Sequence, residues 1–235
     1  MVNIYLIRHG KTMFNTIGRA QGWSDTPLTK LGQRGIQELG LGLKAENVKF
    51  DRAYSSDLGR TLQTMCIILK YSENEGIPYK QDERIREWNY GSFDGDYDAD
   101  LFMGLVPRVV LEACGEEVED PTDEEIANAI YQIDTAGWAE TWEQLRDRIL
   151  EGFYDIARES EEAGANNIVI VDHGMTIGTF VKLIAPEMPR PKDLDNGSVT
   201  HLTYDSGKFT VGLVGDMHYR ALGREILENE LNEQI

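Results

Sequence analysis

The stretch VNIYLIRHG at residues 2–10 decides the fold of this chain. It is an apolar run, rich in isoleucine, that ends abruptly in arginine, histidine and glycine, which is typical of a buried parallel strand as it leaves the core. A second apolar run, at residues 168–171, ends in the same manner before His173. Since the sites of open α/β sheets form beyond the carboxyl ends of their strands, His9 and His173 are expected to face one pocket. Arg8, beside the first histidine, suits that pocket to an anion.

Strand and helix patterns alternate along the rest of the chain. Residues 29–46 carry apolar side chains at helical spacing behind Thr29, which is a suitable helix cap. Strands that alternate with helices predict a three-layer α/β/α sandwich with a mostly parallel central sheet. Further helices are expected at residues 57–71, 141–162 and 175–185, and further strands at residues 50–55, 77–79, 199–204 and 208–214.

Residues 97–138 differ from the rest of the chain. They are acidic, they contain two prolines, and they include a helix start at which Thr122 and Glu125 form a capping box. A second capping box, Thr141 with Gln144, opens the long helix that follows. We therefore predict a single domain over residues 1–235, in which residues 97–138 form an inserted helical lid.

The composition limits the class of protein. A chain of 235 residues with 41% hydrophobic content is long enough for one sizeable core and a small cap. No stretch approaches the ~20 consecutive apolar residues that span a bilayer, and the first residues have no signal-peptide pattern. Cys66 and Cys114 lack metal-binding spacing and are expected to be buried or half-buried. These features predict a cytoplasmic protein that has no membrane partner.

The charge balance is strongly acidic. The 41 acidic and 23 basic side chains give a formal net charge of −18, which argues against nucleic acid as a partner, because a phosphate backbone needs a basic surface. The same negative field slows the approach of a phosphorylated small molecule. A phosphate site must therefore be a local positive pocket, and each arginine near the two histidines gains importance.

Further motifs follow the first one in order along the chain. With these motifs, the chain resembles the histidine phosphatase superfamily, which includes the cofactor-dependent phosphoglycerate mutases. The motifs span nearly the whole chain and leave only residues 97–138 without a clear counterpart. They are IYLIRHGKT at residues 4–12 with Asn15, QG at 21–22, DTPLT at 25–29 with Gly32, SSDLGRT at 55–61, REWNYG at 86–91, DHGMT at 172–176 and NGSVT at 196–200.

The resemblance implies a reaction on a small phosphorylated substrate. His9 matches the residue that attacks phosphorus and forms a phosphohistidine, a role that suits imidazole because much of it is unprotonated near neutral pH. Glu87 matches the group that protonates the leaving oxygen and later takes a proton from the attacking water. Arginine and imidazole groups stabilise the charge, so the resemblance implies no metal and no other cofactor.

The resemblance also implies a set of phosphate-binding residues. Taken alone, Arg60 is typical of a surface cation, Glu87 of a charged loop and Asn15 of a turn cap. Only the order of the motifs places these three around His9. Trp88 follows the proposed acid and is either a packing residue, like the other tryptophans, or a substrate-binding wall of the pocket. The implied phosphate-binding positions are Arg8, Arg60, His173, Asn15, Gln21 and Gly22.

Two positions bear on the choice between phosphatase and mutase. The mutases that this chain resembles commonly carry an arginine and a lysine where this chain has Trp88 and Asp98, and they use these cations to hold a carboxylated bisphosphate. The lid of this chain offers only Arg108. Because such a site would hold the bisphosphate poorly, water would discharge the phosphohistidine. We therefore favour a phosphomonoesterase that acts on a small or moderately apolar phosphate ester.

Two alternatives stay open. Phosphoglycerate mutase is the alternative within enzymes, and a non-catalytic phosphate-binding or protein-interaction module is the alternative from another class. The second alternative needs a missing nucleophile, arginine or acid, and none is missing in this sequence. The sequence does not decide whether the chain forms a homodimer or whether a phosphoprotein is a substrate.

Overall fold

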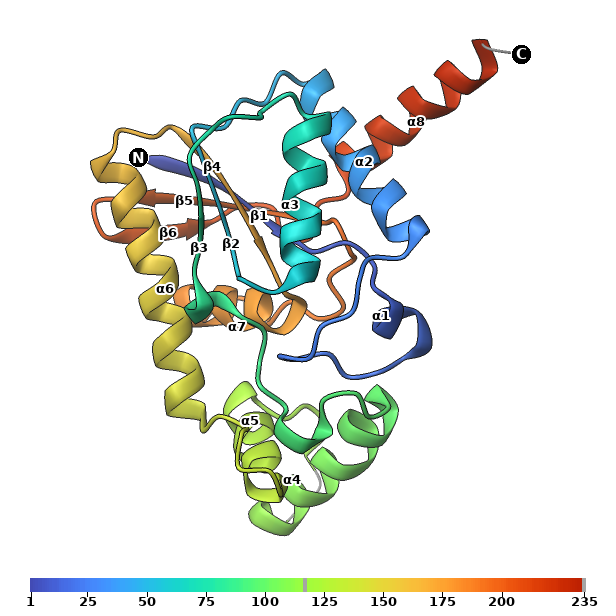
Figure 1. Cartoon of the computed structure of the whole chain (residues 1–235). Helices are drawn as coiled ribbons and strands as arrows, with labels where there is room; N and C mark the ends of the chain where they lie inside the picture. The colour runs from blue at the N-terminus through green and yellow to red at the C-terminus, as the bar shows by residue number, and fades with distance from the viewer. Residues whose placement is uncertain (116–117, 234–235) are drawn as a thin grey trace.

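In residues 1–115 and 118–233, which the computed structural model describes, six strands form one mixed sheet (Figure 1). The four strands on one side of the sheet run parallel, and the other two form an antiparallel hairpin. The mostly parallel sheet predicted from the sequence is thus confirmed. In sheet order the strands are β3 (Tyr79–Gln81), β2 (Arg52–Ser55), β4 (Asn167–Asp172), β1 (Val2–Arg8), β5 (Val199–Asp205) and β6 (Lys208–Val211).

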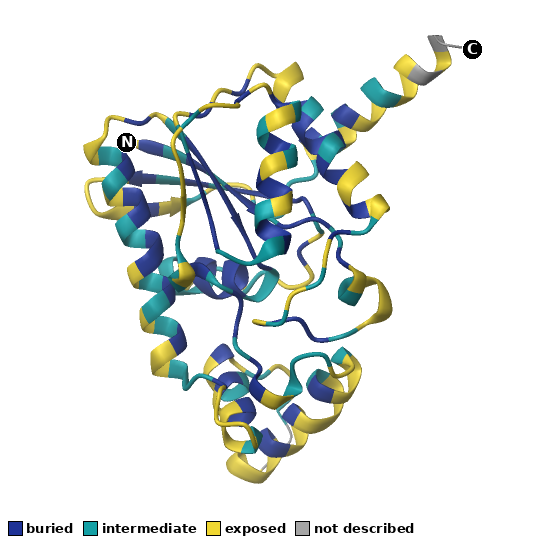
Figure 2. Cartoon of the chain, in the orientation of Figure 1, coloured by how far each residue is buried: buried dark blue, intermediate teal, exposed yellow. Residues whose placement is uncertain are grey.

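Helices cover both faces of the sheet, and the central strands β1, β2 and β4 between them are largely buried (Figure 2). Ile4 and Leu6 of β1 pack on the helices of one face of the sheet, whereas Ile7 packs on the helices of the opposite face. This division arises because successive side chains of a strand point to opposite sides. The predicted three-layer α/β/α sandwich is confirmed. The helices on the face of Ile4 and Leu6 are α6 (Trp142–Glu162) and α7 (Gly174–Ile184). The helices on the face of Ile7 are α2 (Lys30–Ala45), α3 (Gly59–Tyr71) and α8 (His218–Glu233).

The described part of residues 97–138, the predicted lid, lies beyond the carboxyl ends of the parallel strands, below the sheet in Figure 1. We call this segment the lid. Both predicted capping boxes are present, with Thr122 before the last helix of the lid and Thr141 before α6. Val106 and Ile130 of the lid belong to the same buried cluster as Ile4 and Leu6 of β1. The helices of the lid are the π-helix η3 (Ala99–Leu105), α4 (Val106–Cys114) and α5 (Asp123–Ile133).

The terminal helix α8 is not predicted from the sequence. It packs on α2 through close backbone contacts, because a Cβ atom at Gly42 would lie 1.8 Å from the carbonyl oxygen of Tyr219. A Cβ atom at Gly223 would likewise lie 1.7 Å from the carbonyl oxygen of Glu38. Packing through glycine leaves little of the apolar periodicity that reveals a helix in a sequence. Three short helices are also unpredicted, namely α1 (Met13–Ile17), η1 (Glu83–Ile85) and η2 (Gly91–Phe93).

The two cysteines are not where the sequence places them. Cys66 and Cys114 are both exposed, so the expectation of buried or half-buried thiols is wrong. Each lies on a solvent-facing side of its helix, where the surrounding apolar residues do not cover it. No helix of the described ranges combines the length and the apolar character that a membrane span requires.

Candidate active site

His9 follows β1 directly and is only 3% exposed. Its Nδ1 atom lies 2.9 Å from the carbonyl oxygen of Gly10. A carbonyl only accepts, so this contact places the proton on Nδ1 and leaves the lone pair on Nε2. Burial, together with the nearby charges of Arg60 and Arg8, holds the pKa of His9 well below its usual value. His9 is therefore a neutral imidazole whose Nε2 atom has no hydrogen-bond partner in the described residues, as a nucleophile requires.

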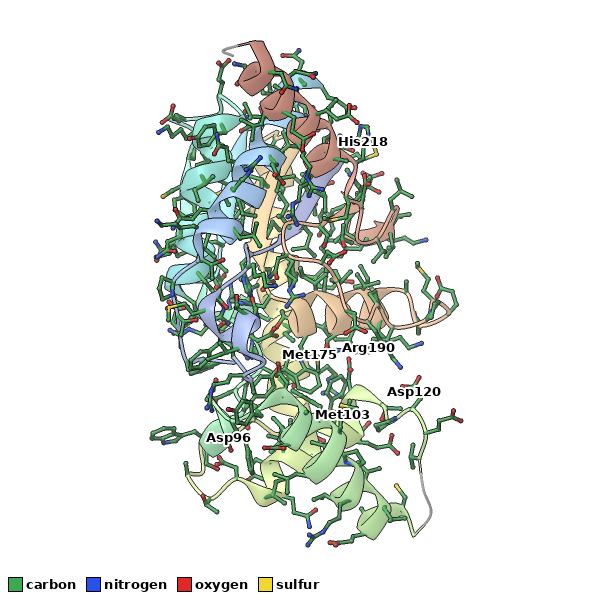
Figure 3. The ribbon with its side chains drawn as sticks, turned by 90° about the vertical axis from the view of Figure 1, so that its right-hand side faces the viewer. Asp96, Met103, Asp120, Met175, Arg190 and His218 are labelled. Carbon is green, nitrogen blue, oxygen red and sulfur yellow. The ribbon has the colours of Figure 1, made fainter. Side chains whose placement is uncertain are left out.

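A cavity of about 550 Å³ opens from His9 toward the lid. Figure 3 labels Met103, Met175 and Arg190, which lie where the core meets the lid. Among the described residues, no group of three or more histidine, cysteine, aspartate or glutamate side chains is placed to hold a metal ion. We call Arg8, His9, Asn15, Gln21, Glu87 and Gly174 the inner half of the cavity. The outer half consists of the other lining residues, namely Gly18, Arg19, Tyr90, Asp98, Ala99, Phe102, Met103, Met175, Arg190, Pro191, Asp193 and Leu194.

Arg8 lines this cavity and has a buried donor without a partner among the described residues. Its Nη1 atom donates to the carbonyl oxygen of Leu194, while its Nε atom is buried and has no hydrogen-bond partner in the described part of the chain. Burial lowers the pKa of Arg8, and the charge of Glu87 acts in the opposite direction. A buried donor without a partner is costly unless a ligand supplies an acceptor. Arg8 is therefore suited to hold an anion near His9.

Arg60, on the first turn of α3, is completely buried. A guanidinium has five N–H donors, and acceptors of the protein already surround all three of its nitrogens. The charge of Arg60 thus lies beside the histidines, but a direct contact with phosphate would have to replace some of these bonds and stays a prediction. The acceptors are Nδ1 of His173 at 3.2 Å, Oδ1 of Asp25 at 3.1 Å, and the carbonyl oxygens of Ser24 at 2.9 Å, Gln21 at 3.4 Å and Gly22 at 2.7 Å.

Hydrogen bonds at both ring nitrogens fix the tautomer of His173. Its Nδ1 atom faces Nε of Arg60, which can only donate, so Nδ1 is an acceptor. Its Nε2 atom lies 2.7 Å from the hydroxyl oxygen of Ser56, which lies 2.9 Å from the hydroxyl oxygen of Thr61. The Thr61 hydroxyl lies 2.7 Å from the carbonyl oxygen of Leu58, which can only accept. The hydrogen bonds therefore run from Nε2 through Ser56 to Thr61.

This arrangement makes His173 a neutral group that orients Arg60. Burial and the charge of Arg60 hold the pKa of His173 well below its usual value. Its ring centroid lies 5.3 Å from that of His9, so the predicted meeting of the two histidines is found. Both ring nitrogens bind groups of the protein, and the implied contact of His173 with phosphate stays a prediction.

Glu87 lies at the N-terminus of α7 and is 5% exposed. Its Oε1 atom accepts hydrogen bonds from the backbone N–H groups of Trp88 at 3.1 Å and Thr176 at 2.9 Å, and from the Thr176 hydroxyl at 3.0 Å. Its Oε2 atom accepts from the N–H of Met175 at 3.1 Å. The free N–H groups of a first helical turn attract a carboxylate to this position. Oε2 accepts fewer bonds and has more capacity for a proton.

The other implied phosphate-binding residues divide into two groups. Asn15 and Gln21 line the cavity as expected, and the Asn15 side chain accepts from the Thr12 N–H at 3.2 Å in the capping box of α1. Gly22 is not part of the lining, and its N–H donates to Asp94 at 2.7 Å. A Cβ atom at Gly22 would lie 2.2 Å from the carbonyl oxygen of Trp88. Gly22 therefore serves a close backbone contact.

Trp88 is a packing residue. It is 2% exposed, does not line the cavity, and belongs to the same buried cluster as Ile130 and Leu145. Neighbouring side chains along a non-helical segment tend to point to opposite sides, so the orientation of Glu87 toward the cavity turns Trp88 away. The cavity does have an aromatic wall, which Tyr90 and Phe102 provide.

The sequence reasoning missed two cations of the outer half. Arg190 reaches the cavity because β5 runs antiparallel to β1, with Val199 opposite Ile7, so the loop before β5 ends at the same sheet edge as His9. Arg19 lies beyond α1, a helix that the sequence analysis does not predict. The sequence did contain one signal for these two arginines: basic residues are scarce in this acidic chain, so each one is a candidate for an anion site. Arg108, the lid cation that the sequence suggests, is exposed and pairs with Glu112 at 3.2 Å.

Comparisons with known proteins agree with this geometry. A model of the histidine phosphatase superfamily (branch 1) matches residues 4–217, and the chain belongs to this family. The crystal structure of phosphoglycerate mutase from Bacillus anthracis is 36% identical, with a TM-score of 0.85 over 95% of this chain and 96% of that chain. A broad-specificity phosphatase of Saccharomyces cerevisiae is 24% identical over 97% of this chain and 92% of its own length. The 2,3-bisphosphoglycerate-dependent phosphoglycerate mutase of Bifidobacterium longum is 28% identical, over 77% and 76% respectively.

Proposed function

We propose that this protein is a phosphomonoesterase that hydrolyses small or moderately apolar phosphate esters through a phosphohistidine on His9. The observation that carries the proposal is the buried neutral imidazole of His9, which lines one cavity with Arg8. Among the described residues, neither Nε2 of His9 nor the buried Nε atom of Arg8 has a hydrogen-bond partner. A nucleophile and an anion-binding donor in one cavity are what the first step of phosphoryl transfer requires. The proposed reaction uses no metal and no other cofactor.

In the first step, Nε2 of His9 attacks phosphorus in line with the ester oxygen. The N–P bond forms as the P–O bond to the leaving alcohol breaks, and Glu87 gives its proton to the departing oxygen. Oε2 of Glu87 is the better placed oxygen for this proton, because Oε1 already accepts three hydrogen bonds and Oε2 accepts one. The charge on Arg8 and Arg60 stabilises the phosphoryl oxygens in the transition state.

In the second step, water attacks the phosphohistidine. Glu87 takes a proton from the water, the new P–O bond forms, and the N–P bond breaks to return neutral His9 and release phosphate. The positive charge of Arg60 favours the neutral His9 because it lowers the pKa of that ring. The same groups thus serve both steps, and Glu87 ends the cycle protonated as it began.

The charges of the outer half favour hydrolysis over mutase chemistry. A mutase must hold a second phosphate and a carboxylate, yet Asp98 lies in the outer half. Arg190 is also compensated, because it forms an ion pair with Asp123 of the lid. Arg19 donates to the carbonyl oxygen of Gly95 and stacks on the ring of Tyr97. The outer half therefore offers little net positive charge to a bisphosphate.

Phosphoglycerate mutase is the second candidate. Two observations favour it, namely the presence of Arg19 and Arg190 in the cavity and the 36% identity to the Bacillus anthracis mutase. A non-catalytic phosphate-binding or interaction module is the alternative from another class. All of the groups that the reaction uses are present in the cavity or beside it, which argues against that module.

Two assays run in parallel test the proposal. We expect release of phosphate from 4-nitrophenyl phosphate and from a small alkyl phosphate at the same rate in excess chelator and in Mg²⁺. We expect the interconversion of 2- and 3-phosphoglycerate, primed with the bisphosphate, to be far slower than the best hydrolysis. Loss of hydrolysis in chelator would contradict the metal-free mechanism. Isomerisation as fast as the best hydrolysis would make the protein a mutase, and inactivity in both assays would favour the non-catalytic module.

A further inference from the structure

Asp98 is one of two carboxylates, with Asp193, among the residues that line the outer half of the cavity. It lies at the start of η3, held by the bond from its backbone N–H to the carbonyl oxygen of Gly18 at 3.0 Å. Its side chain makes no capping bond to the helix. It is half-buried, and burial raises its pKa while the charge of Arg8 acts in the opposite direction. A partly desolvated carboxylate in a binding cavity favours a ligand that brings a positive charge.

The cations of the outer half do not satisfy Asp98, because each of them has other partners. Arg190 pairs with Asp123, and the Asp123 carboxylate also accepts from the Thr179 hydroxyl at 2.8 Å. The guanidinium of Arg19 lies 4.3 Å from the ring centroid of Tyr97 and donates to a backbone carbonyl. The charge that lacks a close partner in this part of the described structure is therefore negative.

Two aromatic rings stand in the same part of the cavity. Tyr90 and Phe102 meet with ring centroids 5.5 Å apart and an interplanar angle of 82°, so they form two perpendicular walls. Both residues line the cavity, together with the thioether of Met175. Aromatic faces attract ammonium groups, and a corner of two rings beside a carboxylate is the arrangement that recognises quaternary ammonium ligands.

From this combination we propose that the outer half of the cavity binds an ammonium group on the leaving alcohol, with Asp98 as its counter-charge and Tyr90 and Phe102 as its walls. The preferred substrates are then phosphate esters of amino alcohols, such as phosphocholine and phosphoethanolamine. This inference rests on the proposed phosphatase function and specifies its substrate class. Arg8 and Asp98 line the same cavity of about 550 Å³, so one small ester can occupy the phosphate and ammonium positions together.

An isosteric pair of substrates isolates the charge. Phosphocholine and 3,3-dimethylbutyl phosphate have the same shape, because a carbon atom of the second replaces the nitrogen of the first. We expect kcat/KM for phosphocholine to exceed that for its neutral isostere about tenfold, or about 1.4 kcal/mol, as a cation in a partly desolvated aromatic site requires. Phosphate release is measured for both esters, and 4-nitrophenyl phosphate reports separately whether the protein is a phosphatase.

Variants then assign the preference to the proposed residues. Asp98→Asn keeps the shape of the side chain and should bring the ratio of the two kcat/KM values close to one. Phe102→Leu should lower the ratio by a smaller factor. Asp100→Asn is the matched control, because it removes the same charge from an exposed position two residues along the same helix and should keep the ratio of the wild-type protein.

The two proposals fail separately. No preference for phosphocholine, or a preference that Asp98→Asn retains, would overturn the ammonium site even if 4-nitrophenyl phosphate is hydrolysed. If no ester is hydrolysed, the phosphatase function fails, and calorimetry on His9→Ala still decides the site by comparing the binding of phosphocholine with that of its isostere. Tighter binding of phosphocholine supports the site, and equal binding contradicts it.

Discussion

The inner and outer halves of the cavity are built in different ways. In the inner half and directly behind it, His9, Arg60, Glu87 and His173 are each at most 5% exposed and bound by hydrogen bonds to neighbouring elements. In the outer half, Met103 is 81% exposed and Asp98 makes no capping bond. The inner half thus holds the groups that react with the phosphate, which every ester shares. The outer half contacts the leaving alcohol, which differs from one ester to the next. Changes in the inner half should affect every ester, and changes in the outer half should alter the ranking of esters.

Among substitutions in the inner half, Glu87→Gln is expected to cause the largest difference in hydrolysis rate between two kinds of ester. Glutamine cannot protonate a leaving oxygen, so hydrolysis of an alkyl phosphate should fall by roughly 10²–10⁴-fold, the usual contribution of general acid catalysis. The loss should be smaller for 4-nitrophenyl phosphate, whose leaving group departs without a proton. Single-turnover rates for the two esters measure the difference, and thermal unfolding checks that the N-terminus of α7 is intact. Equal losses of rate for the two esters would show that Glu87 is not the proton donor, and Asp172 would then be the next residue to test.

A smaller effect is expected from Ser56→Ala. This change removes the acceptor of His173 Nε2–H, frees the ring to change tautomer, and loosens Arg60 from its place beside His9. Because Arg60 lowers the pKa of His9, its displacement should raise that pKa toward the usual value. The acid limb of the kcat/KM profile, which requires neutral His9, should then move to higher pH. The rate at neutral pH should fall by about tenfold, as for a buried hydrogen bond left unmade.

Two further variants separate this role of Ser56 from a loss of packing. Ser160→Ala removes another fully buried hydroxyl, which bonds to Ile156 and Tyr54 between α6 and β2 and makes no bond to either histidine. This change should leave the acid limb in place. Thr61→Val keeps the shape of the side chain but removes the hydroxyl that follows Ser56 in the series of hydrogen bonds from His173. It should move the acid limb in the same direction as Ser56→Ala. An unchanged limb in both Ser56→Ala and Thr61→Val would show that the orientation of Arg60 does not depend on these hydroxyls.

Much of the inner half could be predicted from the sequence. The apolar runs of β1 and β4 end abruptly at His9 and His173, and parallel pairing brings the two ends together, with Arg8 opposite Asp172. Local rules also worked where the relevant residues are close in sequence, as in the capping box of Thr122 with Glu125. The family resemblance supplied Glu87, whose place at the start of α7 depends on contacts between residues far apart in the chain.

Apart from Asp98, which the resemblance indicated, the outer half could not be predicted, for physical reasons. Its wall comes from η3, a π-helix without a simple sequence pattern, and its cation Arg190 enters through the antiparallel course of β5. The direction of Trp88 depends on the local course of the chain after η1, which composition does not reveal. The donors of Arg60 could not be assigned either, because their acceptors are mostly backbone carbonyl oxygens of a distant loop.

The proposed mechanism depends on His9 carrying the phosphoryl group, which chemical quench within the first turnover detects. Glu87→Gln, mixed with radiolabelled 4-nitrophenyl phosphate, should accumulate label because the same substitution slows the attack of water. The account predicts nearly stoichiometric label that is lost in acid, retained in base, and located on the peptide that contains His9, with no label on His9→Ala. Hydrolysis by His9→Ala at the rate of the wild-type protein, or stable label on another residue, would contradict it.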